Sequence, residues 1–317
     1  MNILVLGAGG FIGNHLISRL KNQGHYVCGI DLKYPKFNTS DADEFIIADL
    51  AEYKTFLSLD REFDEVYQLA AEMGGVLFTF NSDNDATIMS NNVQINLNLL
   101  KYAKNIKQPM TIFYSSSACM YPKYNQIDPT NPNCAEDSAY PADPDSEYGW
   151  EKLFSERLFL AHADNTKLKV RIARFHNIFG PFGDWQGGRE KAPAAICRKV
   201  IMGLDQIEII GTGEQTRSFL YIDDCIDAVI QLTRSDVDFP INIGSEEMVT
   251  INQLVDIACV FEDKKLEKIY ISGPTGVPGR NSDNTLIQKN LGWQPKYSLV
   301  QGLKETYFWI KKQTEIS

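Results

Sequence analysis

The 317-residue chain is 44% hydrophobic and 23% charged, and its formal net charge is -10. A chain of this length buries a large core and exceeds one small domain, so we expect one large domain with a dependent lobe, or two domains. The acidic balance provides no electrostatic attraction to nucleic acid or to an anionic membrane, so neither is an expected partner.

Strands and helices alternate through the first half of the chain. Helical patterns follow the glycines after residue 6 and recur at residues 86–105 and 147–161. Short apolar runs predict strands at residues 2–6, 26–30, 45–48, 66–69, 111–114 and 169–173. This alternation predicts a parallel sheet with helices on both faces, which is a Rossmann-like, doubly wound α/β fold.

The second half of the chain is less regular. Residues 180–188 are rich in glycine and aromatic residues and are expected to form a loop. We expect strands at residues 207–210 and 218–221, and helices at residues 192–202, 225–233, 255–261 and 299–311. Residues 1–175 are expected to form the sheet domain, with parts of 218–245 returning to it. Residues 176–317 are expected to form mainly a smaller α/β substrate-binding lobe.

The cysteines and the apolar runs indicate whether the chain binds a metal and where it is located. No two of the six cysteines have C-x-x-C spacing and only four histidines are present, which disfavours a zinc site or a disulfide framework. We expect no metal, and we expect most cysteines to be buried. The strand expected at residues 2–6 leaves no room for a signal peptide, and no apolar run reaches membrane-spanning length. The expected location is therefore cytoplasmic.

A glycine-rich turn follows the first predicted strand. Gly7, Gly10 and Gly13 stand between this strand and a helix, a spacing that lets the backbone approach a pyrophosphate at the helix N-terminus. Asp31 ends the second predicted strand, where a carboxylate hydrogen-bonds the ribose hydroxyls of NAD and repels the 2′-phosphate of NADP. The pattern therefore predicts an NAD-binding domain, although Lys33 nearby leaves NADP open.

A tyrosine and a lysine stand four residues apart on one predicted helix. Tyr148 and Lys152 therefore share a helix face. A nearby ammonium lowers the pKa of a phenol, which makes the tyrosine a usable acid or base near neutral pH. Ser117 can hydrogen-bond the same substrate oxygen. Such a pair usually lies on a surface, but the glycine-rich turn upstream favours a redox site beside a nicotinamide.

These motifs together resemble those of the extended short-chain dehydrogenase/reductase family. The resemblance continues through residues 70–71, 174–181 and 211–219, and so covers nearly the whole chain. It implies a nucleotide-sugar enzyme with NAD in the first domain and the sugar nucleotide between the lobes. The cofactor-binding residues that it implies are Gly7, Gly10, Phe11, Ile12, Gly13, Asp31, Asp49, Leu50, Ala70, Tyr148 and Lys152.

The residues after Ser117 separate the reactions open to such an enzyme. Oxidation of a sugar hydroxyl to a ketone acidifies the neighbouring C–H bonds. A 4,6-dehydratase needs a carboxylic acid just after the serine, where this chain has Ala118 and Cys119, so dehydration is disfavoured. A 4-epimerase has no use for a thiol. A thiol and an amine, Cys119 and Lys191, could exchange protons beside the ketone if positive charge activates the thiol and burial activates the amine.

Within the family, the finer resemblance is to the GDP-mannose 3,5-epimerases. It is carried by residues 71–75, 116–122, 174–182, 187–193 and 279–284. It implies that Cys119 and Lys191 act as the acid/base pair at C3 and C5 of the sugar. The substrate-binding residues that it implies are Gly75 and Gln215 near the sugar or nucleotide, Asn177, Arg217 and Arg280 at the diphosphate, and Lys191.

We therefore predict an NAD-dependent nucleotide-sugar epimerase, with GDP-mannose as the favoured substrate. Its predicted catalytic residues are Ser117, Cys119, Tyr148, Lys152 and Lys191. One alternative is a C4 epimerase or reductase acting on another nucleotide sugar, and another is a non-catalytic NAD-binding sensor of the same fold. Two departures from the family leave the exact sugar open: Glu72 replaces an aspartate, and Trp150 replaces a leucine and could reshape the sugar pocket.

Two of the predicted helices carry extra apolar residues. These are Leu97, Leu100, Leu153 and Phe159, in the helices at residues 86–105 and 147–161. Relatives of this fold pair these two helices across a dimer axis, so the resemblance implies a homodimer.

Overall fold

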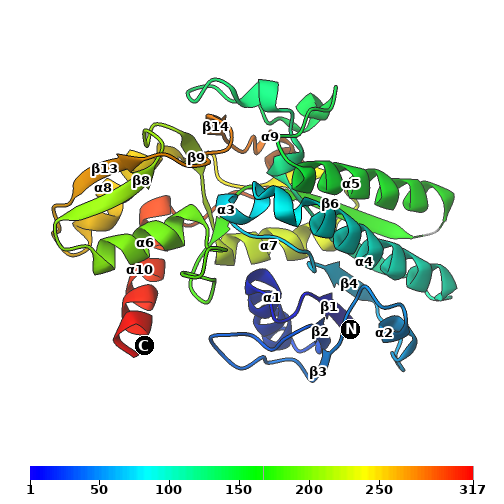
Figure 1. Ribbon diagram of the computed structural model, residues 1–317. Helices are drawn as coiled ribbons and strands as arrows, with labels where there is room; N and C mark the ends of the chain where they lie inside the picture. Colours follow the sequence, from blue (N-terminus) through cyan, green and yellow to red (C-terminus); the bar gives the residue numbers. More distant parts are fainter. Residues whose placement is uncertain (167, 317) are drawn as a thin grey trace.

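A parallel sheet forms the centre of the computed structural model, which describes residues 1–166 and 168–316 (Figure 1). Its strand order is β11-β6-β5-β4-β1-β2-β3, and every pair of neighbours is parallel. This sheet confirms the Rossmann-like, doubly wound fold predicted from the sequence. The strands are β1 (Asn2–Leu6), β2 (Tyr26–Asp31), β3 (Glu44–Ile47), β4 (Glu65–Gln68), β5 (Thr111–Ser117), β6 (Lys169–Phe175) and β11 (Ile241–Ile243).

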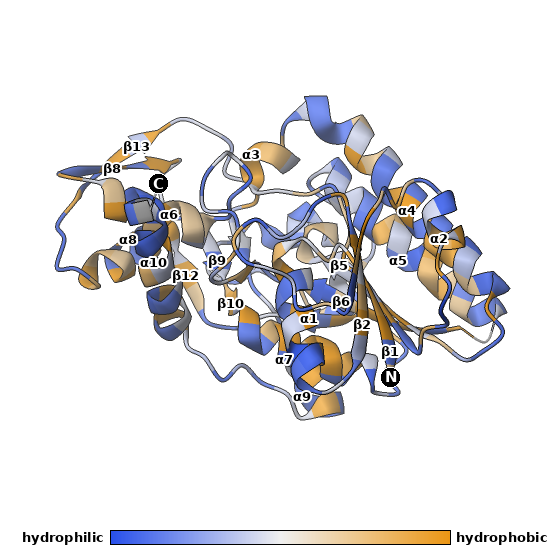
Figure 2. Cartoon of the chain, turned by 90° about the horizontal axis from the view of Figure 1, so that it is seen from below, coloured by the Kyte–Doolittle hydropathy of each residue, from blue (hydrophilic) through white to orange (hydrophobic). Residues whose placement is uncertain are grey.

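The central strands are apolar along their whole length because both faces of the sheet are buried. In β1, Ile3 and Val5 pack into one hydrophobic core, whereas Leu4 and Leu6 pack into a second core on the opposite face. All four side chains are fully buried. This division follows from the two-residue period of a strand. Figure 2 shows the same strands coloured mainly as hydrophobic.

Helices cover both faces of the sheet. On one face, α1 (Phe11–Asn22) packs against α7 (Ile222–Thr233), and α7 also contacts β5 and β6. On the other face, α4 (Asp85–Asn105) packs against α5 (Glu147–Asn165), which contacts the same two strands. The ring of Phe159 on α5 stacks on Tyr114 of β5 with 4.6 Å between centroids. The carboxyl ends of the strands are left free to form a site.

The second lobe lies beside the sheet domain (Figure 1). Its helices α6, α8 and α10 pack against one another and contribute to the first of the two cores. The lobe also contains a parallel pair, β8 with β13, and a small sheet of order β12-β9-β14. The bounds are α6 (Ala192–Met202), β8 (Gln206–Ile210), β9 (Thr216–Ser218), β12 (Met248–Thr250), α8 (Ile251–Val260), β13 (Glu267–Ile271), β14 (Gly279–Arg280) and α10 (Leu299–Ile316).

Several short elements have no counterpart in the sequence prediction. A strand of two residues, or a helix of four to seven, carries too few side chains to display its period. The strand expected at residues 218–221 is divided between β9 and β10, because the first half joins the small sheet and the second half pairs with β7. The remaining short elements are α2 (Lys54–Leu57), α3 (Val76–Thr79), β7 (Ile178–Phe179), β10 (Leu220–Tyr221) and α9 (Thr285–Leu291).

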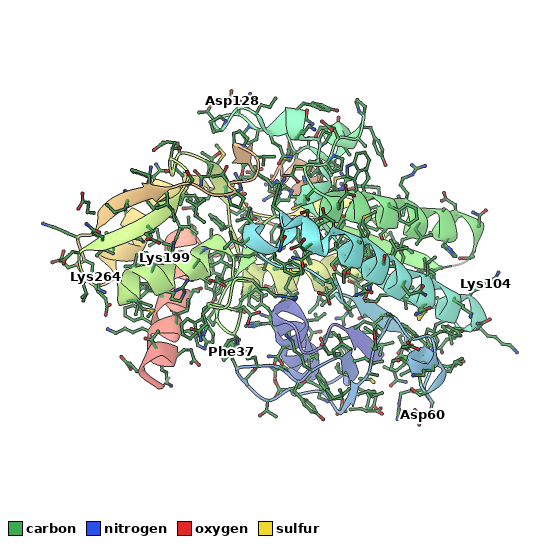
Figure 3. All side chains as sticks on the ribbon, in the orientation of Figure 1. Phe37, Asp60, Lys104, Asp128, Lys199 and Lys264 are labelled. Atoms are coloured by element: carbon green, nitrogen blue, oxygen red, sulfur yellow. The ribbon has the colours of Figure 1, made fainter. Side chains whose placement is uncertain are left out.

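Charged and apolar groups are sorted between the surface and the interior. Charged side chains such as Asp60, Lys104 and Asp128 extend outward at the periphery (Figure 3). Five of the six cysteines are buried, as expected, and only Cys119 is partly exposed. Among the residues that the structure describes, no helix combines the length and the apolar character needed to cross a membrane.

Candidate active site

The glycine-rich turn between β1 and α1 is folded so tightly that side chains would not fit. Gly7 has a φ of +85°, and a Cβ there would lie 2.7 Å from the backbone nitrogen of Ala70. A Cβ on Gly13 would lie 2.1 Å from the carbonyl oxygen of Gly7. The turn therefore brings bare backbone to the start of α1, where Phe11 and Ile12 begin the helix. Such a cradle fits the pyrophosphate of a dinucleotide.

Asp31 ends β2 beside this turn. Its carboxylate accepts hydrogen bonds from the backbone nitrogens of Gly9 (2.9 Å) and Lys33 (3.3 Å). Burial raises the pKa of Asp31, and these backbone donors oppose the rise. Asp49 and Leu50 follow β3 at the same edge of the sheet. Asp31, Asp49 and Leu50 thus lie close to the glycine-rich turn, at the edge where the parallel strands end. The Asp31 carboxylate suits the ribose hydroxyls of NAD.

A cavity of about 300 Å³ is lined by residues of both lobes. The sheet domain contributes α3, the end of β5 and the first turn of α5, and the second lobe contributes α6, β8 and β9. A cavity at this junction has the size of a small-molecule site. The predicted residues that line it are Gly75, Ser117, Cys119, Tyr148, Asn177, Lys191, Gln215, Arg217 and Arg280.

Cys119 lies in a short 3-10 helix, Ala118–Met120, that follows β5. The hydroxyl of Ser117 caps this turn by accepting a hydrogen bond from the Cys119 backbone nitrogen at 3.2 Å. Nη1 of Arg280 lies 3.0 Å from the Cys119 sulfur. Arg280 is itself fixed, because it also donates to Gln126 (2.5 Å) and to Asp145 (3.1 Å). The thiol therefore faces a rigidly held positive charge.

Tyr148 and Lys152 occupy adjacent turns of α5 and both are buried. Tyr148 lines the cavity, whereas Lys152 lies behind it and donates a hydrogen bond to the carbonyl of Ser115 at 3.0 Å. Burial raises the pKa of Tyr148 and lowers the pKa of Lys152, and a hydrogen bond with Ser117 partly lowers the pKa of the phenol. This differs from the expected lowering of the phenol pKa, because desolvation and the charges of Cys119 and Glu151 outweigh the hydrogen bond with Ser117. Nζ of Lys152 lies 5.6 Å from the centroid of the phenol ring.

Lys191 is the N-cap of α6, and Pro193 follows in the first turn of that helix. Burial lowers the pKa of its amine, as the sequence argument required. The segment before it packs closely on Gly75, whose nitrogen donates to the carbonyl of Arg189 at 3.0 Å. A Cβ on Gly75 would lie 2.3 Å from the carbonyl oxygen of Glu190. Gly75 thus lets the loop that carries Lys191 approach the cavity wall.

The other predicted substrate-binding residues are held mainly by backbone groups. Asn177 has a φ of 46° and donates to the carbonyl of Ser218 at 3.0 Å. Gln215 donates to the carbonyl of Ile210 at 3.1 Å. Arg217 donates to the carbonyls that flank Gly276. Burial, with a smaller effect of Arg280, lowers the pKa of Arg217 to about 10.

Two residues that are close in sequence to predicted site residues, His176 and Trp150, lie away from the cavity. His176 is fully buried, and its Nε2 pairs with Oδ1 of Asn242 at 2.9 Å. Burial lowers its pKa to about 3, so His176 is a packed and neutral side chain. Trp150 is 40% exposed and is absent from the described lining of the cavity. The expectation that Trp150 could reshape the sugar pocket was wrong, because its side chain lies on the outer face of α5.

Sequence reasoning missed the residues that hold Arg280. Asp145 stands in a stretch rich in proline and aspartate, which has the composition of a surface turn, yet its side chain is 8% exposed. Gln126 is fully buried in a short 3-10 helix. Neither residue has a periodic or motif signal in the sequence. Their association with Arg280 depends on contacts across 135 and 154 residues of chain.

The fold and the cavity define a class of enzyme that has a dinucleotide-binding turn and a tyrosine and lysine pair beside a small-molecule cavity. The chain belongs to the NAD dependent epimerase/dehydratase family, whose model matches residues 3–244. This membership confirms the predicted family and the predicted cofactor, NAD.

Curated relatives and solved structures agree with this assignment. The GDP-mannose 3,5-epimerase of Arabidopsis thaliana is 47% identical over 317 residues, covering 99% of this chain and 83% of the relative. GDP-mannose 3,5-epimerase 1 of Oryza sativa subsp. japonica has the same identity and coverage. The UDP-glucose 4-epimerase of Thermotoga maritima, solved with UDP-glucose, superposes with a TM-score of 0.88 at 26% identity, covering 99% of this chain and 100% of that chain. The UDP-glucuronic acid 4-epimerase of Bacillus cereus, solved with UDP-glucuronic acid and NAD, has a TM-score of 0.82 at 27% identity, with the same coverage.

The cradle gives a direct test of cofactor binding. Gly13→Ala is expected to weaken NAD binding by about tenfold or more, because relieving the contact with the Gly7 carbonyl requires a backbone shift that costs roughly 1–3 kcal/mol. Calorimetric titration with NAD measures the change. Gly183→Ala is the matched control, because a Cβ there meets Phe11 at an ordinary 3.4 Å. Equal affinity of Gly13→Ala and the wild type would contradict this account.

Proposed function

We propose that the protein is an NAD-dependent nucleotide-sugar epimerase that acts on GDP-mannose at C3 and C5. The observation that carries the proposal is that a thiol and an amine, Cys119 and Lys191, come from different lobes and line the same cavity as Tyr148. The 47% identity to GDP-mannose 3,5-epimerases over nearly the whole chain supports the choice of sugar nucleotide. Residues 1–175, with parts of 218–245, form the NAD-binding domain in this proposal, and residues 176–317 form mainly the substrate lobe.

Tyr148 moves the proton of the C4 hydroxyl. Bound NAD supplies the reversible oxidation and reduction at C4. Ser117, which hydrogen-bonds the phenol, orients the same sugar oxygen. Lys152 provides a positive charge behind the phenol and favours its phenolate form. These three residues create the C4 ketone and later reverse it.

Cys119 and Lys191 move the carbon-bound protons while the ketone is present. One group removes a proton from a carbon next to C4, and the other returns a proton to the opposite face, which inverts that carbon. Arg280 sets a permanent positive charge beside the sulfur, the environment in which catalytic cysteines are found. Asn177, Arg217 and Arg280 hold the diphosphate in this proposal, with Gly75 and Gln215 near the sugar or nucleotide.

A C4 epimerase acting on another nucleotide sugar is the second candidate. The superposition on a UDP-glucose 4-epimerase with a TM-score of 0.88 supports it. That reaction would use Ser117, Tyr148 and Lys152 alone. It would leave the partly exposed thiol of Cys119 and the desolvated amine of Lys191 without a role.

Solvent deuterium distinguishes the two reactions. Turnover of GDP-mannose in D₂O is expected to place deuterium at C5 and at C3, because protons removed by Cys119 and Lys191 exchange with solvent. NMR and mass spectrometry of the recovered sugar nucleotides locate the label. Turnover without label at either carbon would establish C4 chemistry and refute the 3,5-epimerase proposal.

A serine at position 119 separates the two stages of the reaction. Cys119→Ser is expected to retain reduction of NAD by the substrate, seen as absorbance at the nicotinamide band. It is expected to slow incorporation of deuterium by about 100-fold or more, because a hydroxyl is a far weaker acid than a thiol. Cys134→Ser is the matched control, because Cys134 is buried at 2% exposure. A wild-type rate for Cys119→Ser would make the thiol structural.

We further propose a cytoplasmic homodimer that pairs α4 and α5 across its axis. Three of the four residues expected to favour this contact, Leu100, Leu153 and Phe159, are buried within the subunit itself. The apolar side chains available on the outside of these helices are instead Leu97 (42% exposed), Trp150 (40%) and Phe154 (51%). In this proposal these exposed apolar side chains contribute to the subunit interface.

The dimer is testable by placing a charge on this surface. Phe154→Glu is expected to convert the dimer to a monomer, because a carboxylate would be buried without a partner. Light scattering coupled to size-exclusion chromatography gives the mass. Phe308→Glu on α10, where the phenylalanine is 42% exposed, is the control and should leave the mass unchanged. A wild-type protein that is already monomeric, or an unaffected Phe154→Glu dimer, would contradict the proposed interface.

A further inference from the structure

A buried carboxylate that the proposed reaction does not use lies beside Lys152. Glu151 is fully buried and precedes Lys152 on α5. Its Oε2 is 4.0 Å from Nζ of Lys152. Within the described part of the chain, no other lysine or arginine forms an ion pair with Glu151. Lys152 is therefore the one basic partner of Glu151 among the described residues.

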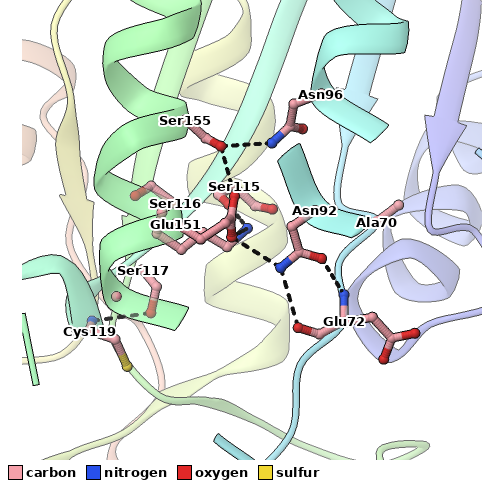
Figure 4. Close-up of polar contacts among 12 residues, drawn as sticks. Ala70, Glu72, Asn92, Asn96, Ser115, Ser116, Ser117, Cys119, Glu151 and Ser155 are labelled. Carbon is pink, nitrogen blue, oxygen red and sulfur yellow. Dashed lines mark hydrogen bonds and ion pairs between the residues drawn. The ribbon is translucent and has the colours of Figure 1, made fainter. Parts of the chain in front are cut away.

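The hydrogen bonds around Glu151 all point toward its carboxylate (Figure 4). The hydroxyl of Ser155 donates to Oε1 at 2.7 Å, and the amide of Asn92 donates to Oε2 at 3.0 Å. Ser155 in turn accepts from Asn96 at 3.0 Å, and Asn96 accepts from Gln68 at 2.8 Å. Both carboxylate oxygens of Glu151 therefore meet a hydrogen-bond donor, and donors aligned in one direction strengthen one another.

A second carboxylate near Lys152 is already compensated. Glu156 accepts from Arg174, with 2.9 Å between Nη2 and Oε2, and it also accepts from Ser116. Because Arg174 matches its charge at close range, Glu156 acts on Lys152 more weakly than Glu151 does. Glu151 is thus the principal counter-charge of the catalytic lysine.

The other groups that face Lys152 are few. They are the phenol rings of Tyr114, at 5.0 Å from Nζ, and of Tyr148, at 5.6 Å, together with the thiol of Cys119. Burial lowers the pKa of Lys152, and Glu151, Glu156 and Cys119 raise it in that order of size. A buried amine without such counter-charges favours the neutral form.

We propose that Glu151 is a positioning residue that keeps the Lys152 ammonium charged behind Tyr148. This inference rests on the function proposed above, because it concerns the acid/base pair of that reaction. Glu151 does not line the cavity. Burial, the charge of Cys119 and the charge of Glu151 itself raise the pKa of Tyr148, so Glu151 supports the phenolate only through the charge that it maintains on Lys152. Loss of its charge would remove the cation that stabilises the Tyr148 phenolate.

Asn92 connects the same carboxylate to the wall of the sugar cavity. While it donates to Glu151, its Oδ1 accepts from the backbone nitrogen of Glu72 at 2.7 Å, and its Nδ2 lies 3.4 Å from the Glu72 carbonyl (Figure 4). Met73 and Gly75, which follow, line the cavity. Removal of Asn92 therefore loosens the cavity wall and leaves the charge of Glu151 in place, which separates the two effects.

The test is the pH dependence of Glu151→Gln. A glutamine keeps the shape, because its oxygen can accept from Asn92 and its nitrogen can donate to Ser155. Removing the negative charge lowers the pKa of Lys152 further, so the protonated form is lost at a lower pH. The basic limb of the kcat profile is expected to move down by about one pH unit. The titration midpoint of Lys152, followed without substrate by NMR of ¹³Cε-lysine and assigned with Lys152→Met, is expected to fall equally.

Two variants serve as controls. Asn92→Ala is expected to raise KM for the nucleotide sugar several-fold and to leave the basic limb in place. Glu151→Asp restores the charge and is expected to return the limb toward its wild-type position. An active wild type with an unmoved limb and midpoint in Glu151→Gln would overturn the inference, as would a uniform loss of kcat at all pH values with a lower Tm. A wild type without turnover would refute the proposed function, and the NMR titration would still decide the role of Glu151.

Discussion

The constraint on which the site depends is the burial of an ammonium between the sheet and α5. Lys152 is 2% exposed, and desolvation of a charge is among the most expensive events in folding. The polar groups around it compensate for this cost. The Ser115 carbonyl accepts a hydrogen bond from the ammonium. The carboxylate of Glu151, which is held by residues of α4 and α5, balances the charge. The polar residues that interrupt the apolar contact between α4 and α5, such as Asn92 and Asn96, follow from this one cation.

A second fixed charge, the guanidinium of Arg280, lies where the two lobes meet. Arg280 belongs to the small sheet of the second lobe, but its partners Asp145 and Gln126 belong to the part of the chain before α5. The arginine is therefore positioned before any ligand arrives. Preorganised charges of this kind need little rearrangement during a reaction, and this is a main source of electrostatic catalysis in enzymes.

Most of the fold could be predicted from local sequence patterns. The glycine-rich turn, Asp31 and the spacing of Tyr148 and Lys152 could be read from the sequence, because each depends on neighbours in one strand, turn or helix. Short elements such as β11 were not predicted, since three residues show no period. The outward direction of Trp150 and the burial of Glu151 were also inaccessible, because α5 is packed on several sides and its apolar pattern does not mark one face. Arg280 was predicted as a ligand of the diphosphate, but its contact with the Cys119 sulfur required the tertiary structure.

The unequal burial of the cysteines determines which thiol of the folded protein can react. Five thiols are shielded by the cores, and burial raises the pKa of each, so they are poor nucleophiles. Cys119 alone is partly open, in the cavity and beside a guanidinium. An electrophile or oxidant that enters the folded protein therefore meets this sulfur first. Oxidation and covalent labelling are therefore both expected at the Cys119 sulfur. The rate at which this thiol is labelled reports whether the cavity is intact.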